Sequence, residues 1–171
     1  MAETLLAWFN RYSYDPHDVE VRLKGRPVLL YEPAEAAESK DDEDDDYQFR
    51  TQSGLEVTSI SGGEPLAVVV EKTKDNAFQR RVTIGRTNNN DIVLDDTLVS
   101  RFHAWLQQDE GNGEWQLFDA GSRNGTMVGG KKLPAKAAVV LTAGVKVKIG
   151  AVELTFYSAE GFLKLLKQRA T

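Results

Sequence analysis

The sequence contains no cysteine and only two histidines among its 171 residues. Without cysteine, the chain can form neither disulfides nor thiolate metal sites, which suits a reducing compartment. The two histidines, His17 and His103, lie far apart in the sequence, so a metal centre built on imidazole ligands is not expected. We therefore expect no metal ion and no cofactor.

Long apolar runs are also missing. No stretch approaches the roughly 20 apolar residues that span a bilayer. The first residues, Met-Ala-Glu-Thr-Leu-Leu-Ala-Trp, lack the basic start and the long apolar segment of a secretory signal. These absences predict a soluble, cytoplasmic protein without a membrane partner. The length is sufficient for one substantial domain with extensions.

The net charge of −5 is unevenly distributed along the chain. Residues 1–64 carry 6 basic and 15 acidic residues, whereas residues 65–171 carry 15 basic and 11 acidic residues. The second part is therefore mildly basic, with a net charge of +4. That excess is too small to predict nucleic-acid binding, but it suits an anionic ligand held at one place.

Residues 1–31 are predicted to form an N-terminal extension with a helix and a hairpin. Over residues 3–12, apolar residues recur at the spacing of one helix face: Leu5, Trp8, Phe9 and Tyr12. Residues 19–23 then alternate apolar and charged, Gly25-Arg26-Pro27 interrupts the pattern, and Val28–Tyr31 is apolar again. Residues 32–47 follow as an acidic linker, predicted to be disordered because it has almost nothing to bury.

Residues 48–158 are predicted to form an all-β sandwich. Short strand-like runs with turn residues between them recur without a helical period: Leu55–Ile60, Leu66–Val70, Arg80–Ile84, Asp91–Leu94, Phe102–Gln108, Trp115–Asp119, Gly125–Val128, Val145–Ile149 and Val152–Tyr157. Residues 159–171 are predicted as a C-terminal helix capped by Ser158, with Phe162, Leu165 and Leu166 on one face. We expect the two terminal helices to pack on the sandwich or on each other; the alternative is a partner-docking face.

A hairpin brings two separated polar segments together. Phe102–Gln108 and Trp115–Asp119 are joined by a loop that contains Asn112-Gly113, a strong hairpin signal. In an antiparallel hairpin the first strand begins where the second ends. Ser100 and the loop 120–125 are therefore predicted to be neighbours, about twenty residues apart in sequence.

The residue types in these two segments and in Gly85-Arg86, which the hairpin does not place, suit a phosphate group. A phosphate dianion is bound by a guanidinium fork, small hydroxyls and amides, and backbone N–H groups that glycine allows to approach. The chain supplies the side chains at Arg86, Ser100, Arg101, Ser122, Arg123 and Asn124, and the permissive backbone at Gly85, Gly121 and Gly125. We predict that the six side chains contact a phosphorylated ligand.

These motifs resemble the signature of the forkhead-associated (FHA) domain. Gly85-Arg86, Ser100-Arg101-Phe102-His103 and Gly121-Ser122-Arg123-Asn124-Gly125-Thr126 match the family's Gly-Arg, Ser-x-x-His and Ser-x-Asn-Gly in order. The resemblance covers roughly residues 65–158. It implies a sandwich of about eleven strands in two sheets, whose loops at one end bind a phosphothreonine peptide.

The resemblance also implies roles for individual residues. The family's phosphate-binding arginine and serine correspond to Arg86 and Ser100, with Arg101 as a further contact, and the asparagine that holds the peptide backbone corresponds to Asn124. Arg123 stands where family members often carry a small polar residue, so an additional contact is expected there. The remaining matched positions are expected to support the site: Gly85, His103, Gly125 and Thr126.

The favoured function is a phosphothreonine-dependent protein-binding module in Ser/Thr kinase signalling, without catalysis. Its expected partner is a phosphothreonine-containing protein, either a Ser/Thr kinase or a kinase substrate. The alternative is a scaffold or oligomerisation protein that uses the same fold without phosphate. An enzyme is not expected, because neither a carboxylate cluster for a metal nor a nucleophile paired with His103 can be identified.

Three further hypotheses about function each concern one segment of the chain. Residues 125–131 have the G-x-x-x-x-G-K shape of a nucleotide-binding loop, but Lys132 replaces its Ser or Thr and no helix is expected to follow. The acidic run Asp41–Asp46 could compete with ligand at the phosphate site instead of serving as a plain linker. Whether a threonine of the extension, such as Thr4 or Thr51, becomes a ligand when phosphorylated stays open.

Overall fold

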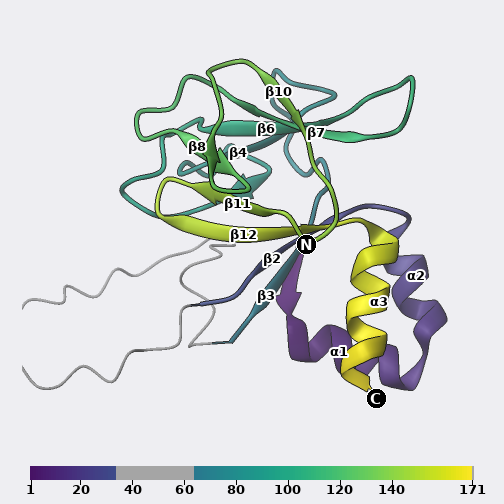
Figure 1. Cartoon of the computed structure of the whole chain (residues 1–171). Helices are drawn as coiled ribbons and strands as arrows, with labels where there is room; N and C mark the ends of the chain where they lie inside the picture. The colour runs from purple at the N-terminus through teal and green to yellow at the C-terminus, as the bar shows by residue number, and fades with distance from the viewer. Residues whose placement is uncertain (34–63, 171) are drawn as a thin grey trace, which may run out of the picture.

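The structure is a computed structural model that describes residues 1–33 and 64–170. Two β-sheets face each other, and three helices lie on one side of them (Figure 1). The seven-stranded sheet has the order β1-β3-β2-β12-β11-β8-β9 and the five-stranded sheet the order β10-β7-β6-β4-β5. The strands are β1 (Ala2–Thr4), β2 (Val28–Tyr31), β3 (Leu66–Val69), β4 (Val82–Gly85), β5 (Ile92–Val93), β6 (Ala104–Gln108), β7 (Trp115–Asp119), β8 (Thr126–Val128), β9 (Lys131–Lys132), β10 (Ala138–Val140), β11 (Lys146–Ile149) and β12 (Val152–Tyr157).

The main hydrophobic core lies between the two sheets. Strand β11 shows how the sequence builds it: Val147 and Ile149 are buried, whereas Lys146 and Lys148 point to solvent. This alternation is the two-residue period of a strand with one buried face. The predicted all-β sandwich is confirmed, with twelve strands among the described residues where about eleven were expected.

A second core lies between the outer face of the seven-stranded sheet and the helices α1 (Leu5–Tyr14), α2 (Pro16–Leu23) and α3 (Ala159–Ala170). Trp8 of α1 and Phe162 of α3 meet edge to face, with ring centroids 5.7 Å apart, and both are fully buried. Strands β2 and β3 are apolar throughout because the sandwich core covers one face and the helices cover the other. The apolar helix faces therefore pack within the chain, as expected.

The predicted hairpin over residues 19–31 is wrong in its first half, because Val19–Leu23 belongs to α2. The Asp15 side chain accepts a hydrogen bond of 3.0 Å from the His17 N–H, and Pro16 occupies the first helical turn. Val19 and Leu23, four residues apart, are buried. A short apolar alternation fits both a strand and a helix of this spacing, and the cap decides for the helix.

The second half of that hairpin, Val28–Tyr31, forms β2, which pairs with β3 and β12 in the middle of the larger sheet. Together with β1, it contributes two strands of residues 1–31 to the sandwich, so this region is not a separate extension. The C-terminal helix forms where predicted, and the Ser158 hydroxyl accepts a hydrogen bond of 3.1 Å from the Gly161 N–H. Most of the predicted linker 32–47 and the whole predicted strand Leu55–Ile60 lie outside the described residues.

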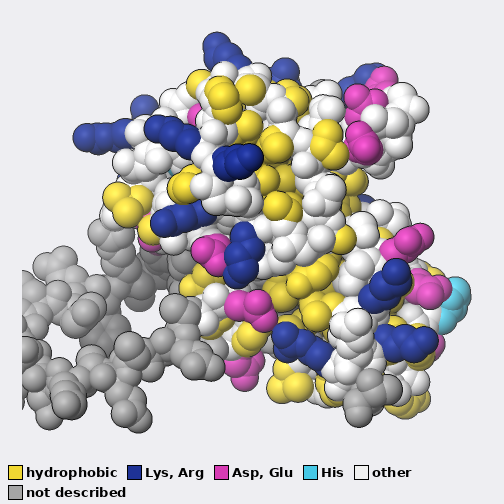
Figure 2. Space-filling view, viewed as in Figure 1, with side chains coloured by type: hydrophobic (Ala, Val, Ile, Leu, Met, Phe, Trp, Pro, Cys, Tyr) yellow, Lys and Arg dark blue, Asp and Glu magenta, His cyan; other side chains and the backbone are white. Residues whose placement is uncertain are grey.

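Charge is arranged unevenly on the surface as well. Figure 2 shows one face, on which basic side chains gather over the sandwich near β8, whereas both signs mix over the helices. No helix in the described ranges is both long and apolar enough to cross a membrane.

Candidate functional site

The predicted neighbours do meet at one end of the sandwich. Strands β6 and β7 pair in antiparallel register, with Ala104 opposite Asp119, as the Asn112-Gly113 turn predicts. The backbone N–H of Arg123 donates to the Ser100 hydroxyl oxygen at 3.0 Å. The end of β4 joins them, because the Arg86 N–H donates to the Ser100 carbonyl oxygen at 3.0 Å. Three loops distant in sequence thus form one surface.

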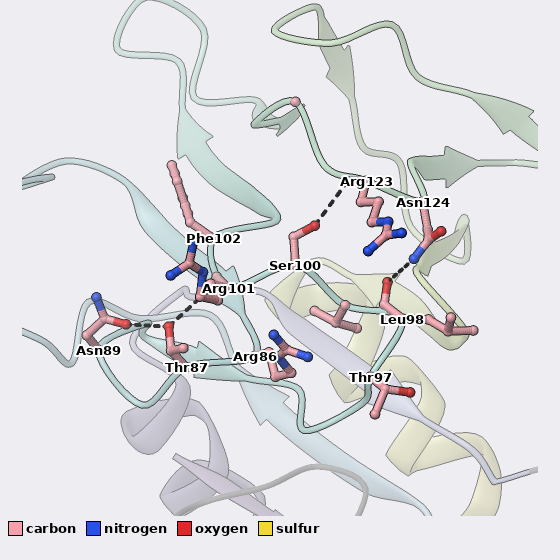
Figure 3. Close-up of a pocket in the computed structure, with 12 residues that line it drawn as sticks. Arg86, Thr87, Asn89, Thr97, Leu98, Ser100, Arg101, Phe102, Arg123 and Asn124 are labelled. Atoms are coloured by element: carbon pink, nitrogen blue, oxygen red, sulfur yellow. Dashed lines mark hydrogen bonds between the residues drawn. The ribbon is translucent and has the colours of Figure 1, made fainter.

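These loops line an open cavity of about 890 Å³. Figure 3 shows the side chains around it, with Arg86 and Arg123 on two sides of Ser100. Its lining contains three arginines and no carboxylate: Arg86, Thr87, Asn89, Thr97, Leu98, Val99, Ser100, Arg101, Phe102, Gly121, Arg123 and Asn124. All three arginine side chains are exposed, and the structure gives them no ion pair with any described residue. Among the described residues, no acidic group therefore compensates the positive charge of the cavity.

Two polar side chains in the cavity are oriented by the backbone around them. Because the Ser100 hydroxyl oxygen accepts from the Arg123 N–H, its own proton is free to donate to a ligand. The Asn124 side-chain nitrogen donates to the Leu98 carbonyl oxygen at 2.9 Å. That bond leaves the Asn124 side-chain oxygen as an acceptor for a ligand N–H group.

His103 lies behind the cavity and holds two of its loops together. Its Nδ1 accepts a hydrogen bond of 3.0 Å from the Ser100 N–H, so the proton of the neutral ring is on Nε2. Nε2 lies 3.0 Å from the Gly125 carbonyl oxygen and donates to it. Burial lowers the pKa of His103 because a charged imidazolium would be poorly solvated there. The ring is fully buried, which fits the expected supporting role.

Ser122 was predicted to contact ligand, but it does not line this cavity. Its hydroxyl donates to a carboxylate oxygen of Asp119 at 2.6 Å and accepts from the Gly125 N–H at 3.0 Å. Thr126, fully buried, donates to the same Asp119 oxygen at 2.7 Å. Ser122 thus shapes the loop 120–125 from within, because its hydroxyl is already used on both sides.

Asp119 itself is a residue that sequence reasoning missed. Burial alone would raise the pKa of this carboxyl, but hydrogen bonds from Ser122 and Thr126 outweigh it and leave the pKa below its ordinary value. The ionised carboxylate also accepts from the backbone N–H groups of Gly121 and Ser122 at 2.8 and 2.9 Å. Its position at the end of β7, before Gly121-Ser122, is the sequence signal that could have identified it.

Gly85 lies where two backbone segments nearly touch. A Cβ atom at this position would be 2.2 Å from the Arg101 carbonyl oxygen and 2.7 Å from the Asn90 side-chain nitrogen. Asn90, which sequence reasoning also missed, is buried and donates to that same carbonyl oxygen at 2.7 Å and to the Thr87 carbonyl oxygen at 2.9 Å. Gly85 and Asn90 together fix the distance between the loop after β4 and the loop before β6.

Asp91 anchors the loop that carries Arg86 from its other end. Its fully buried carboxylate accepts from Lys72 at 2.9 Å and from the backbone N–H groups of Thr83 and Lys74, each at 2.8 Å. Burial works against ionisation, but the hydrogen bonds, with that of the Thr83 N–H largest, lower the pKa of Asp91 overall.

Within the described ranges, no group of three or more His, Asp or Glu residues could hold a metal ion.

Comparisons with known proteins show which family has such an arrangement of loops. The family model described as the FHA domain matches residues 82–150. The chain is 37% identical over 112 residues to the oxoglutarate dehydrogenase inhibitor of Corynebacterium diphtheriae, covering 62% of this chain and 73% of that protein. It is 39% identical over 108 residues to the glycogen accumulation regulator GarA of Mycolicibacterium smegmatis, covering 57% and 65%.

The chain is also similar to two solved structures. The FHA domain of an Arabidopsis thaliana hypothetical protein matches with 26% identity and a TM-score of 0.45, covering 54% of this chain and 73% of that one. The N-terminal FHA domain of Rad53p from S. cerevisiae, in complex with a phosphothreonine peptide, matches with 19% identity and a TM-score of 0.47, covering 58% and 87%.

Proposed function

The chain belongs to the forkhead-associated domain family, and from that premise we propose that its loop cluster binds proteins phosphorylated on threonine. The observation that carries the proposal is the cavity, in which three exposed arginines surround Ser100 without a carboxylate. Such a surface attracts a dianion and offers it charge-assisted hydrogen bonds, which are stronger than bonds between neutral groups. The module is non-catalytic.

The geometry supports a distinct role for each group. Arg86 offers the phosphate a guanidinium fork, and the Ser100 hydroxyl proton donates to a phosphate oxygen because its own oxygen is occupied by the Arg123 N–H. Arg101 and Arg123 contribute further positive charge at the rim. The Asn124 side-chain oxygen accepts a backbone N–H of the bound peptide. Ser122 is reassigned from ligand contact to support of the loop.

The cavity also contains apolar surface that can distinguish threonine from serine. Leu98, with 49% of its surface exposed, lines it beside the polar groups. A phosphothreonine has a methyl group that phosphoserine lacks, and burying one such group contributes about 0.8 kcal/mol. That difference corresponds to about fourfold in affinity.

The partner is expected to be a Ser/Thr kinase or one of its substrates, and the place of action the cytoplasm. Two relatives have the names of a regulator and of an enzyme inhibitor, which supports a regulatory role for this chain by binding. Neither name implies catalysis by the relative itself. A phosphate-independent scaffold that docks through the terminal helices is not favoured, because their apolar faces pack within the chain.

A peptide titration tests the proposal. A peptide selected on the wild-type protein from a phosphothreonine library would be synthesised in three forms, with phosphothreonine, phosphoserine or plain threonine at the same position. We expect the phosphothreonine form to bind severalfold more tightly than the phosphoserine form, and the plain form to bind at least about 100-fold more weakly. Equal affinity for the phosphorylated and plain forms, measured by fluorescence anisotropy, would exclude the proposed function.

A further inference from the structure

Four aromatic rings form a continuous row on the surface of the sandwich. Phe78 stacks on Phe102 with ring centroids 5.2 Å apart, Phe102 on Trp105 at 6.0 Å, and Trp105 on Phe118 at 4.9 Å. We refer to these four residues as the aromatic row. Three of the side chains are partly exposed, and Trp105, in the middle of the row, is 9% exposed.

The row lies on the outer face of the five-stranded sheet. Trp105 of β6 and Phe118 of β7 are opposite each other in the register. Their chain neighbours Leu106 and Leu117 point the other way, into the core between the sheets. None of the four rings belongs to either hydrophobic cluster of the described residues. The four rings therefore pack mainly on one another, and Phe78, Phe102 and Phe118 keep part of their surface exposed.

One arginine lies over the row, and its charge has no acidic partner among the described residues. The Arg81 guanidinium lies 4.7 Å from the centroid of the Trp105 ring and 5.4 Å from that of Phe78. Its neighbour Arg80 forms an ion pair with Glu110, whereas the structure gives Arg81 no carboxylate partner among the described residues. The indole nitrogen of Trp105 is also buried without a hydrogen-bond partner in that part of the chain.

The row meets the phosphate cavity at its second ring, Phe102. Phe102 lines that cavity and directly follows Ser100 and Arg101, yet its ring stacks on both Phe78 and Trp105. In Figure 3 the Phe102 side chain extends from the rim, away from Asn124. A peptide bound in the cavity can therefore continue onto the row without a gap. An extended segment of about five residues covers the ring spacings of the row, at about 3.3 Å per residue.

We propose that the aromatic row and Arg81 are a second contact surface for the phosphoprotein that occupies the cavity. The surface takes an apolar or aromatic side chain with a carboxylate next to it, in the segment that flanks the phosphothreonine. The rings bury the apolar group, and Arg81 pairs with the carboxylate. Aromatic and arginine residues are the types that dominate binding energy at protein interfaces. This inference rests on the proposed function of the cavity.

The test uses the full-length chain and a phosphothreonine peptide library with twelve randomised residues on each side. The peptides selected on the wild type are resynthesised in a long form and in a short form with three residues on each side. We expect the selected long peptides to carry an apolar residue beside an acidic one, and to bind about tenfold more tightly than the short forms. In Arg81→Glu this gain should disappear, while affinity for the short form stays unchanged.

Arg80→Glu is the matched control, because it makes the same charge change on the preceding residue, away from the row; it should keep the tenfold gain. If Arg81→Glu fails to fold, Arg81→Gln replaces it, and the comparison of long and short peptides on the wild type holds without any variant. Equal affinity of long and short peptides, or a gain that survives both Arg81 substitutions, would overturn this inference while leaving the cavity's function intact. Loss of phosphate-dependent binding to the short peptide on the wild type would overturn both.

Discussion

Arg86→Ala is expected to weaken the binding of a phosphothreonine peptide by at least about 100-fold without destabilising the fold. A guanidinium makes two hydrogen bonds to a phosphate, each contributing about 1.5–3 kcal/mol because both partners are charged. The side chain is exposed and pairs with no carboxylate of the described residues, so the fold does not depend on it. The structural bond of this residue, from its backbone N–H to the Ser100 carbonyl oxygen, survives the substitution.

Two further variants test whether the effect of Arg86→Ala is specific to the guanidinium in this cavity. Isothermal titration calorimetry measures the peptide affinity of each variant. Arg86→Lys keeps the positive charge but loses the planar fork, so an intermediate loss of about tenfold is expected. Arg80→Ala removes an exposed arginine whose partner is Glu110, outside the cavity, and should leave affinity unchanged. Unchanged affinity in Arg86→Ala, or an equal loss in Arg80→Ala, would show that binding depends on overall charge and not on this cavity.

Gly85→Ala is expected to destabilise the protein by about 3 kcal/mol, the upper end of the usual range for overpacking. The added Cβ would lie 2.2 Å from the Arg101 carbonyl oxygen, which belongs to the backbone and cannot rotate away. Separating the loops to make room strains the hydrogen bonds from Asn90 to Arg101 and from the Arg86 N–H to Ser100. In a chain of this length, the melting temperature should fall by about 10 °C.

Gly111→Ala serves as the control for the Gly85 substitution. Gly111 lies in the exposed β6–β7 turn, and the atom nearest to an added Cβ would be a side-chain oxygen of Asp109 at 3.2 Å. This oxygen accepts hydrogen bonds from the Gly111 and Asn112 N–H groups, and it needs to shift only slightly to make room, so a cost below about 1 kcal/mol is expected. Denaturant unfolding measures both variants. If the two substitutions cost the same, the close approach of the Gly85 and Arg101 backbones does not hold the site together.

The central geometry of the site could be predicted because it depends on a local signal. The Asn112-Gly113 turn fixed the β6–β7 hairpin, and the hairpin placed Ser100 beside the loop 120–125. The buried supports were harder to see. Asp119 and Asn90 have the residue types of ordinary turns, and only the fold shows that they are buried and hydrogen-bonded to the loops of the site. For the same reason Ser122 could not be separated from Ser100 by residue type alone.

The N-terminal region shows where local patterns are insufficient. Val19–Leu23 has an apolar alternation that a strand and a short helix share, and the Asp15 cap decides between them. Strand β2 pairs with β3 and with β12, and no local pattern shows that a strand near the start of the chain pairs with one near its end. Such pairing depends on long-range contacts that propensity and periodicity do not report.

An NMR titration of the ¹⁵N-labelled chain with a selected phosphothreonine peptide tests the central claim most directly. The account predicts that the largest amide shifts occur at Arg86, Ser100, Arg101, Arg123 and Asn124, that they saturate together, and that the unphosphorylated peptide does not produce them. Shifts confined to α1 and α3, or identical shifts with both peptides, would contradict it and favour a phosphate-independent scaffold.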